Sequence, residues 1–372
     1  MVRTSSILNV LAVFVQIIIS FNATFHSESN LYAHRTCLAN AEEFRIINRV
    51  TTTSQIHEPR TRFSIMRKFP FHCIWTLCLF AITTTSMAAE TKTILLLAGK
   101  PSHGPGDHEH NAGILLFGKC LKENVPNLNI VTHLSGEWPT ADELHKADTI
   151  VFYADGGGGH PAVQADHLKQ LQSEMKRGAG LVCIHYAVEV QANKGGPEFK
   201  EWLGGYFEPH WSVNPHWTAN FKALPKHPVT SGVNPFSTND EWYYHMRFRD
   251  KMDSVTTILT DLPPVSTLDR PDGTHSGNPH VRKAIANGEP QHVGWAVERA
   301  DGGRGFGFSG GHYHKGWGND DQRKLLLNAI LWTSKIDVPA GGVVSKVTAD
   351  ELAQNLDPKP GSKPVKPKSK AE

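Results

Sequence analysis

The chain has 372 residues, enough for one large or two medium domains, and its formal net charge is only +2. A balance this close to neutral gives no bulk attraction to nucleic acid or to anionic membranes, so we expect no nucleic-acid partner. Histidine is unusually abundant, with 21 residues, and this points to sites built from imidazole groups.

The N-terminal part carries the pattern of an export signal. Residues 66–68 (Met-Arg-Lys) form a positive n-region, residues 69–82 an apolar h-region, and residues 86–88 (Ser-Met-Ala) a small-x-small cleavage site. We predict a signal peptide at 66–88, cleavage near Ala88, and a secreted or periplasmic mature chain without a stable membrane span. A signal at an internal Met also predicts that residues 1–65 are an over-extended gene start. The alternative is a hydrophobic patch within a genuine N-terminal region.

Strand-like and helix-like segments alternate in the first half of the remaining chain. Short apolar runs predict strands, and segments with apolar residues at helical spacing separate them. This alternation favours a parallel sheet with right-handed crossovers and helices on both faces. We expect strands at 91–98, 129–133, 148–153 and 178–184, and helices at 109–123, 141–146 and 161–177.

The strand at 178–184 ends at His185. A sharp turn after a central strand holds its first residue at the carboxyl edge of the sheet, where α/β folds place their chemistry. Taken alone, His185 could equally be a strand-capping residue bonded to backbone. Other histidines also lie in Gly-rich or post-strand loops, and this favours a functional site at His185. They are His103, His108, His110, His160, His312 and His314.

The second half of the chain is less regular. A turn-rich loop at 263–288 is long enough to suggest a functional lid. Residues 336–372 lose their periodicity and become rich in Pro and Lys, so we predict a disordered tail. Before the loop we expect a helix at 197–203 and strands at 240–245 and 256–259. Between the loop and the tail we expect a hairpin of strands at 293–298 and 306–309, and a helix at 320–334.

Three motifs in this order resemble the trehalose-utilisation (ThuA-like) family. They are residues 180–185 (GLVCIH), residues 240–243 (DEWY), and residues 303–305 (GRG) followed by a strand and Gly311-His312. The resemblance covers residues 91–335 and implies an α/β, flavodoxin-like fold similar to class I glutamine amidotransferases. It also implies a role in the use of sugars such as trehalose, including the handling of oxidised keto-sugar derivatives.

The same resemblance argues against glutamine hydrolysis. In the amidotransferases the turn after the strand carries a Cys nucleophile, and a later His-x-Glu supplies a base and its orienting carboxylate. Here that turn carries His185, and the later strand end reads His312-Tyr313-His314. Cys183 lies two residues early and, by strand alternation, deeper on the same side. The Cys nucleophile and the orienting carboxylate that hydrolysis through a thioester requires are therefore missing from these positions.

Three interpretations of the histidines remain open. Some of them could ligate a divalent metal, with His185, His312 and His314 as candidates and His160 in addition. His185 and His312 could instead act without metal as general acid and base. In the third interpretation, the histidines serve only as hydrogen-bonding groups in a sugar-binding cleft. We assign catalysis to His185, His312 and Glu241, and substrate binding to His160, Asp155, Trp242, Tyr243 and His314.

Aromatic residues in the irregular half fit a carbohydrate partner, because their faces suit the apolar faces of pyranose rings. The leading hypothesis is an enzyme acting on a sugar or keto-sugar, and the alternative is a non-catalytic sugar-binding module. A Gly-rich run at 156–159 could also bind an anion or polar hydroxyls. The aromatic residues considered are Trp202, Tyr206, Trp211, Trp217, Trp242, Tyr243 and Trp317.

Overall fold

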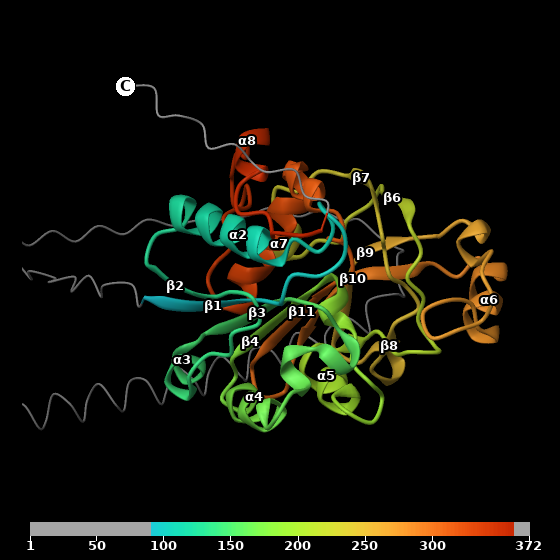
Figure 1. The fold of residues 1–372 in the computed structure, drawn as a ribbon, viewed down its shortest axis with the longest axis horizontal. Coiled ribbons are helices and arrows are strands. Elements are labelled where there is room, and N and C mark those ends of the chain that lie inside the picture. Colours follow the sequence, from blue (N-terminus) through green and yellow to red (C-terminus); the bar gives the residue numbers. More distant parts are fainter. Residues whose placement is uncertain (1–90, 361–372) are drawn as a thin grey trace, which may run out of the picture. The chain divides into compact units, whose positions relative to one another are not determined.

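A computed structural model of the chain describes residues 91–360. The predicted gene start and signal peptide lie outside these residues, as do residues 361–372. Seven strands form one sheet in the order β2-β1-β3-β4-β11-β10-β9, and helices cover both of its faces (Figure 1). The expected α/β, flavodoxin-like architecture is therefore confirmed.

The parallel half of the sheet follows the predicted order closely. β1 pairs with β2 and β3, and β3 pairs with β4, all in parallel. The strands are β1 (Lys92–Ala98), β2 (Leu128–His133), β3 (Thr149–Tyr153) and β4 (Gly180–Ile184).

Three helices connect these four strands. α2 (His110–Asn124) and α3 (Ala141–Lys146) lie within two residues of their predicted bounds. α4 (His167–Lys176) starts later than residue 161, because short 3-10 turns at Gly157–Gly159 and Pro161–Val163 precede it.

Consecutive residues of the central strands enter two different core layers. In β4, Val182 and Ile184 share one layer with side chains of α2 and α7 (Asp320–Thr333), whereas Leu181 and Cys183 share the other with side chains of α3 and α4. Because both faces of the sheet are covered, the strands are apolar throughout rather than alternating. Figure 1 shows α2 and α7 on one side of the sheet and α3, α4 and α5 on the other.

The antiparallel edge of the sheet contains the predicted hairpin. β10 (Gln291–Glu298) and β11 (Arg304–Phe308) are antiparallel, and β11 pairs in parallel with β4. The expected strand at 256–259 is β9 (Val255–Asp261). It was expected outside the main repeat, but it forms the edge of the main sheet beside β10, where it buries Ile258 and Leu259.

A long insertion between β4 and β9 carries two small sheets. α5 (Gly196–Trp202) lies where a helix was expected. In place of the strand expected at 240–245, the structure has a strand that ends at Asp240. The Asp240 carboxylate accepts the Glu241 N–H and so helps to turn the chain out of the ladder. The loop at 263–288 includes α6 (Pro279–Ala286). The small sheets pair β5 (Gly205–Tyr206) with β8 (Arg247–Phe248), and β6 (Trp217–Phe221) with β7 (Phe236–Asp240).

Part of the predicted disordered tail is ordered against the domain. Within residues 336–360 the chain forms α8 (Ala349–Leu352), and the Asp357 N–H donates to Glu109 Oε2 at 2.6 Å. Lys359 Nζ lies 3.4 Å from Glu109 Oε1, and both side chains are buried. Composition alone misjudged this segment, because a buried ion pair and backbone contacts hold it in place. Between residues 91 and 360, no helix is long and apolar enough to cross a membrane.

Candidate functional site

His185 occupies a sharp turn at the carboxyl end of β4. Its φ is +57°, a left-handed conformation that is uncommon for a residue other than Gly and carries strain. The turn leads from the strand into a 3-10 helix at His185–Val188, so the imidazole stays at the edge of the sheet. The position predicted from the apolar run is therefore the position observed.

Glu241 and His312 are held at the same edge by one buried carboxylate. Asp240, at the end of β7, accepts the N–H groups of Glu241 at 2.8 Å and His312 at 3.0 Å. It also accepts the Gly311 N–H at 2.8 Å, where φ is +104°. Burial raises the pKa of Asp240, and these backbone donors and nearby histidines oppose that rise. A single side chain thus ties the insertion to the loop after β11.

His108 completes the group, although the site prediction did not include it. It lies in the loop between β1 and α2 with φ at +46°, and its N–H donates to the His312 carbonyl at 2.9 Å. The available signal was its place in a His-rich loop after the first strand. The sequence could not distinguish it from His103 and His110 in that loop.

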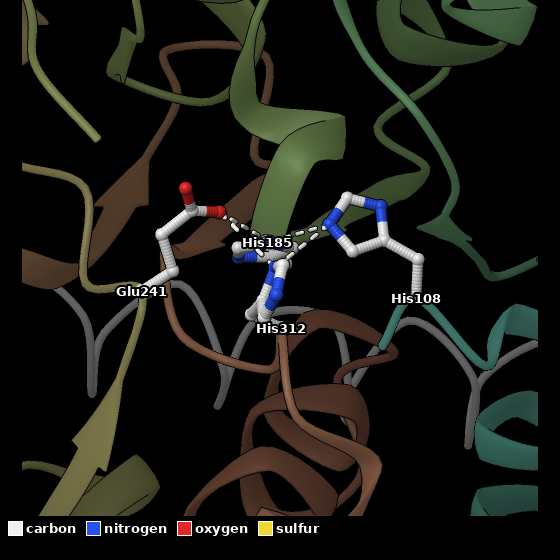
Figure 2. A group of neighbouring side chains, drawn as sticks. All are labelled: His108, His185, Glu241 and His312. Carbon is white, nitrogen blue, oxygen red and sulfur yellow. Dashed lines mark hydrogen bonds and ion pairs between the residues drawn. The ribbon is translucent and has the colours of Figure 1, made fainter. Parts of the chain in front are cut away.

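The four side chains point toward one another from four separate segments (Figure 2). We call His108, His185, Glu241 and His312 the His/Glu cluster; all four residues are buried. The distances are 3.0 Å from His108 Nε2 to His185 Nε2, 3.0 Å from His108 Nε2 to His312 Nδ1, 3.1 Å from His312 Nδ1 to Glu241 Oε2, and 3.5 Å from His185 Nε2 to Glu241 Oε2.

Two partners outside the cluster fix where the imidazole protons lie. His108 Nδ1 is 2.8 Å from Asp155 Oδ1, and His185 Nδ1 is 2.8 Å from the Ser309 carbonyl oxygen. Both oxygens only accept, so each Nδ1 carries a proton, and a ring with no second proton presents a lone pair at Nε2. The two Nε2 atoms lie 3.0 Å apart, and a metal ion or a shared proton at this place would stabilise the contact.

Electrostatics at the cluster also favour a cation. Burial and the neighbouring histidines hold the pKa of His108 far below its usual value, so its ring is neutral. Burial alone raises the pKa of Glu241, but hydrogen bonds and charge from His185 and His312 outweigh it and hold that pKa well below the usual range. The cluster thus places the neutral ring of His108 beside an ionised carboxylate.

The spacing of the four atoms fits a small divalent metal. Ligand atoms about 2.0–2.1 Å from a tetrahedral Zn²⁺ lie about 3.3 Å from one another. Four of the six separations between these atoms are 3.0–3.5 Å, close to this value, and all six lie within 4.8 Å. Three imidazole nitrogens and one carboxylate oxygen are also a donor set that Zn²⁺ and similar transition metals accept.

More exposed polar side chains form a rim around the cluster. The His103 ring stacks on His108 with centroids 3.6 Å apart. His216 Nε2 lies 3.7 Å from Glu241 Oε1, and Asp107 Oδ2 lies 3.7 Å from His312 Nε2. These groups are partly open to solvent and could exchange protons with a bound molecule.

The structure brings some of the predicted binding residues to the cluster. Asp155 accepts from His108, as described, and Tyr243 lies beside His185 with its hydroxyl 3.3 Å from Nε2. Asp155 therefore orients a ring of the cluster. Tyr243 is almost fully buried against it.

Trp242, His160 and His314 are not brought to the cluster. Trp242 is fully buried and packs on Phe308, so it has no face for a sugar. His160 bonds backbone groups through both ring nitrogens. His314 Nε2 donates to the Leu352 carbonyl at 3.0 Å, away from the cluster. Most of the tryptophans predicted to line a cleft are likewise in the core, because their large apolar area is worth more there than at a surface.

Cys183 has no part in the site. It is fully buried in the core layer under α3 and α4, and burial raises the pKa of its thiol. A thiol in this environment stays protonated and is a poor nucleophile.

Comparison with known families gives the wider context. Residues 95–333 match the family model ThuA, described as trehalose utilisation. The chain belongs to the ThuA family. No curated protein matches the chain.

Two solved structures of ThuA-like proteins are similar to this ThuA-family chain. One, from Bacteroides uniformis, is 17% identical, with a TM-score of 0.46, and the match covers 68% of this chain and 96% of that one. The other, from Parabacteroides merdae, is 15% identical, with a TM-score of 0.43, and covers 70% and 94%. The family description supports a carbohydrate-related function.

Proposed function

We propose that this ThuA-family protein is an enzyme of carbohydrate utilisation that binds a divalent metal at the His/Glu cluster and acts on a sugar or keto-sugar. One observation carries the proposal. Three imidazole nitrogens and one carboxylate oxygen converge within 4.8 Å of one another, and four of the six pairs are 3.0–3.5 Å apart.

Each residue of the cluster has a defined task in this proposal. With a metal bound, His108, His185 and His312 would supply imidazole nitrogens, and Glu241 would supply negative charge. A divalent metal held there would polarise a carbonyl or hydroxyl oxygen of a sugar. Asp155 and the Ser309 carbonyl keep the two Nδ1 protons in place and so keep the rings turned inward.

Proton transfer falls to the rim. Burial lowers the pKa of His103 below 6.5, although Asp155 opposes this shift, so the ring is neutral near pH 7 and can accept a proton. His216 is the corresponding group on the Glu241 side, with its Nδ1 3.1 Å from the Tyr313 hydroxyl. Both rings are more exposed than the cluster, as proton donors and acceptors must be.

Metal analysis tests the first part of the proposal. The purified protein should contain close to one equivalent of a divalent transition metal by plasma mass spectrometry, and His185→Ala should lose it. His145→Ala is the matched control, because its side chain is 73% exposed and remote from the cluster in sequence and fold. A metal-free wild-type protein that also fails to take up Zn²⁺, Mn²⁺ or Fe²⁺ would contradict the proposal.

Activity then separates an enzyme from a sugar-binding module. Sugars and keto-sugars should be incubated with the metal-loaded protein and followed by mass spectrometry and NMR. Conversion that depends on the metal and on His185 supports the enzyme. Binding without conversion, unaffected by His185→Ala, would favour the non-catalytic module.

Export is part of the same proposal. It rests on the pattern at residues 66–88, which lie outside the described part of the chain. N-terminal sequencing of the protein from its native host should find a start within a residue or two of Ala89. A mature chain that retains residues 1–65 would refute both the start site and the cleavage site.

A further inference from the structure

The loop at residues 104–109 supplies His108 to the His/Glu cluster. On one side it is bonded to the segment after β11, because the His108 N–H donates to the His312 carbonyl and the Gly106 carbonyl accepts the His314 N–H, both at 2.9 Å. These bonds place two cluster residues, His108 and His312, on neighbouring stretches of backbone. The position of the loop therefore decides where the His108 ring lies relative to the other three side chains.

The loop needs further contacts to keep its shape. His103, just before it, and His108, within it, both have a left-handed backbone, with φ at +61° and +46°. Residues other than Gly keep such a conformation only where the surrounding structure holds them in it. The bonds to the segment after β11 do not use the carbonyl oxygens of Gly104 and Asp107.

Lys359 binds the loop at these oxygens. Its Nζ donates to the carbonyl oxygens of Asp107 and, at 3.3 Å, of Gly104, and it lies 3.4 Å from Glu109 Oε1. The Lys359 and Glu109 side chains are only 2% and 1% exposed. An ammonium group has three N–H donors and no acceptor, so three oxygens match it. The loop thus forms a small cation site, which the chain fills with its own ammonium group.

Glu109 connects this cation site to the backbone on both sides. Its Oε1 also accepts the Gly106 N–H at 2.8 Å, and its Oε2 accepts the Asp357 N–H at 2.6 Å. Because the carboxylate is buried, its charge is costly unless a cation lies beside it. Lys359 therefore compensates the charge of the residue directly after His108.

The C-terminal segment holds Lys359 in place through contacts outside the loop. Lys119 Nζ on α2 lies 2.5 Å from Glu351 Oε1 on α8, and Asn111 Nδ2, also on α2, donates to Asp357 Oδ1 at 2.5 Å. Both contacts fasten the segment to a helix that packs on the sheet. The segment therefore brings the ammonium group to a defined position and does not simply follow the loop.

We propose that Lys359 is a positioning residue of the metal site, a tethered cation whose ammonium group sets the position of the loop that carries His108. Through this contact, the C-terminal segment controls how tightly the His/Glu cluster binds its metal. By thermodynamic linkage, a bound metal in turn favours the docked segment. This inference rests on the proposed function, because it takes the cluster as the metal site.

Titration of the chelator-treated Lys359→Ala protein with Zn²⁺ in a calorimeter measures the effect. We expect the affinity to fall about tenfold, the lower end of the range for outer partners of metal ligands, because Lys359 acts through the loop. Lys169→Ala is the matched control, since it removes an exposed ammonium group from α4 on the other side of the sheet. Affinities within about twofold of wild type for both variants would overturn the proposal.

Chemical rescue separates positioning from a general loss of stability. In Lys359→Ala, methylammonium can occupy the place of Nζ and donate to the same three oxygens. Methylammonium chloride should restore the Zn²⁺ affinity to within about threefold of wild type, whereas tetramethylammonium chloride, which has no N–H to donate, should not. Neither salt should change Lys169→Ala. A loss of affinity that methylammonium does not repair would overturn the role of a tethered cation.

Hydrogen exchange of the metal-free protein gives a readout that does not depend on the metal. Amides in residues 104–110 should exchange faster in Lys359→Ala than in wild type and slow again with methylammonium, while those of α4 should not change. Unchanged exchange in this loop would overturn the positioning role, whatever the metal affinity.

This inference and the proposed function fail in distinguishable ways. If wild-type protein takes up no metal but the loop loses protection in Lys359→Ala and regains it with methylammonium, the proposed function fails. The role of Lys359 in placing the loop then stands. If wild-type protein binds metal through His185 and Lys359→Ala binds it equally well, only the inference about Lys359 fails.

Discussion

The histidines of the His/Glu cluster and the single residue His160 are all buried near the carboxyl edge of this sheet, but their ring nitrogens face different partners. In the His/Glu cluster, a nitrogen of each ring faces another member of the cluster. His160 is equally buried, but its Nδ1 accepts the Ala162 N–H at 2.9 Å and its Nε2 donates to the Ala187 carbonyl at 3.0 Å. The first group has nitrogen lone pairs left for a ligand, and His160 has none.

The difference shows that burial alone does not identify a metal ligand. A buried histidine whose two nitrogens bond backbone groups is a structural element, comparable to a cap or a turn. A buried histidine with one nitrogen fixed by an acceptor and the other turned toward equivalent nitrogens is prepared for a cation. The predictions below test this distinction.

Removing a ring of the cluster should have the largest effect. His108→Ala should lower the affinity for Zn²⁺ by more than about 100-fold, because changes to the outer partners of metal ligands alone cost about 10–100-fold. Titration calorimetry of the chelator-treated protein measures this loss. Affinity should also fall as the pH is lowered, since protons compete for the imidazole nitrogens. Affinity within about threefold of wild type would remove His108 from the ligand set.

Deleting residues 357–372 should destabilise the fold beneath His108. Lys359 and the Asp357 N–H both contact the buried carboxylate of Glu109, the residue next to His108. Leaving that charge without its partner should lower the free energy of unfolding by about 3 kcal/mol. Urea denaturation measures the change.

A deletion of residues 361–372 is the matched control, because it removes none of these contacts. If both deletions leave the urea midpoint unchanged, the ordered segment contributes nothing to stability. The original expectation from composition would then hold for the whole tail.

Asp155→Asn should weaken the metal site by a smaller amount. The Asp155 carboxylate accepts from His108 Nδ1 at 2.8 Å, and an amide would hold that proton less firmly. We expect metal affinity to fall by about tenfold while the thermal melt stays the same. Asp142→Asn is the control, since its side chain is 70% exposed on α3. Equal affinities for the two variants would show that Asp155 does not orient the ring.

His160→Gln should have the smallest effect on the site. Loss of at least one of its two backbone hydrogen bonds should lower the free energy of unfolding by about 1–2 kcal/mol. Metal content should stay at the wild-type level, because neither nitrogen faces the cluster. A folded variant that has lost its metal would place His160 in the site after all.

The sequence determined the elements whose partners are close along the chain. The apolar runs of β1 to β4, the helical spacing of α2 and the hairpin of β10 and β11 are local patterns, and the structure agrees with each of them. His185 was also found this way, since a residue that follows a buried parallel strand must lie at the carboxyl edge.

Only the tertiary structure decided which side chains meet His185. His108 and His312 are 204 residues apart, yet His108 Nε2 lies 3.0 Å from His312 Nδ1. No local spacing encodes that contact, because it depends on strand order and on the buried Asp240 that holds Glu241 and His312. The periodicity of the sequence likewise could not predict how the His160 ring is oriented, that Trp242 is buried, or that Lys359 packs against the domain. Each of these is fixed by contacts between residues far apart in the sequence.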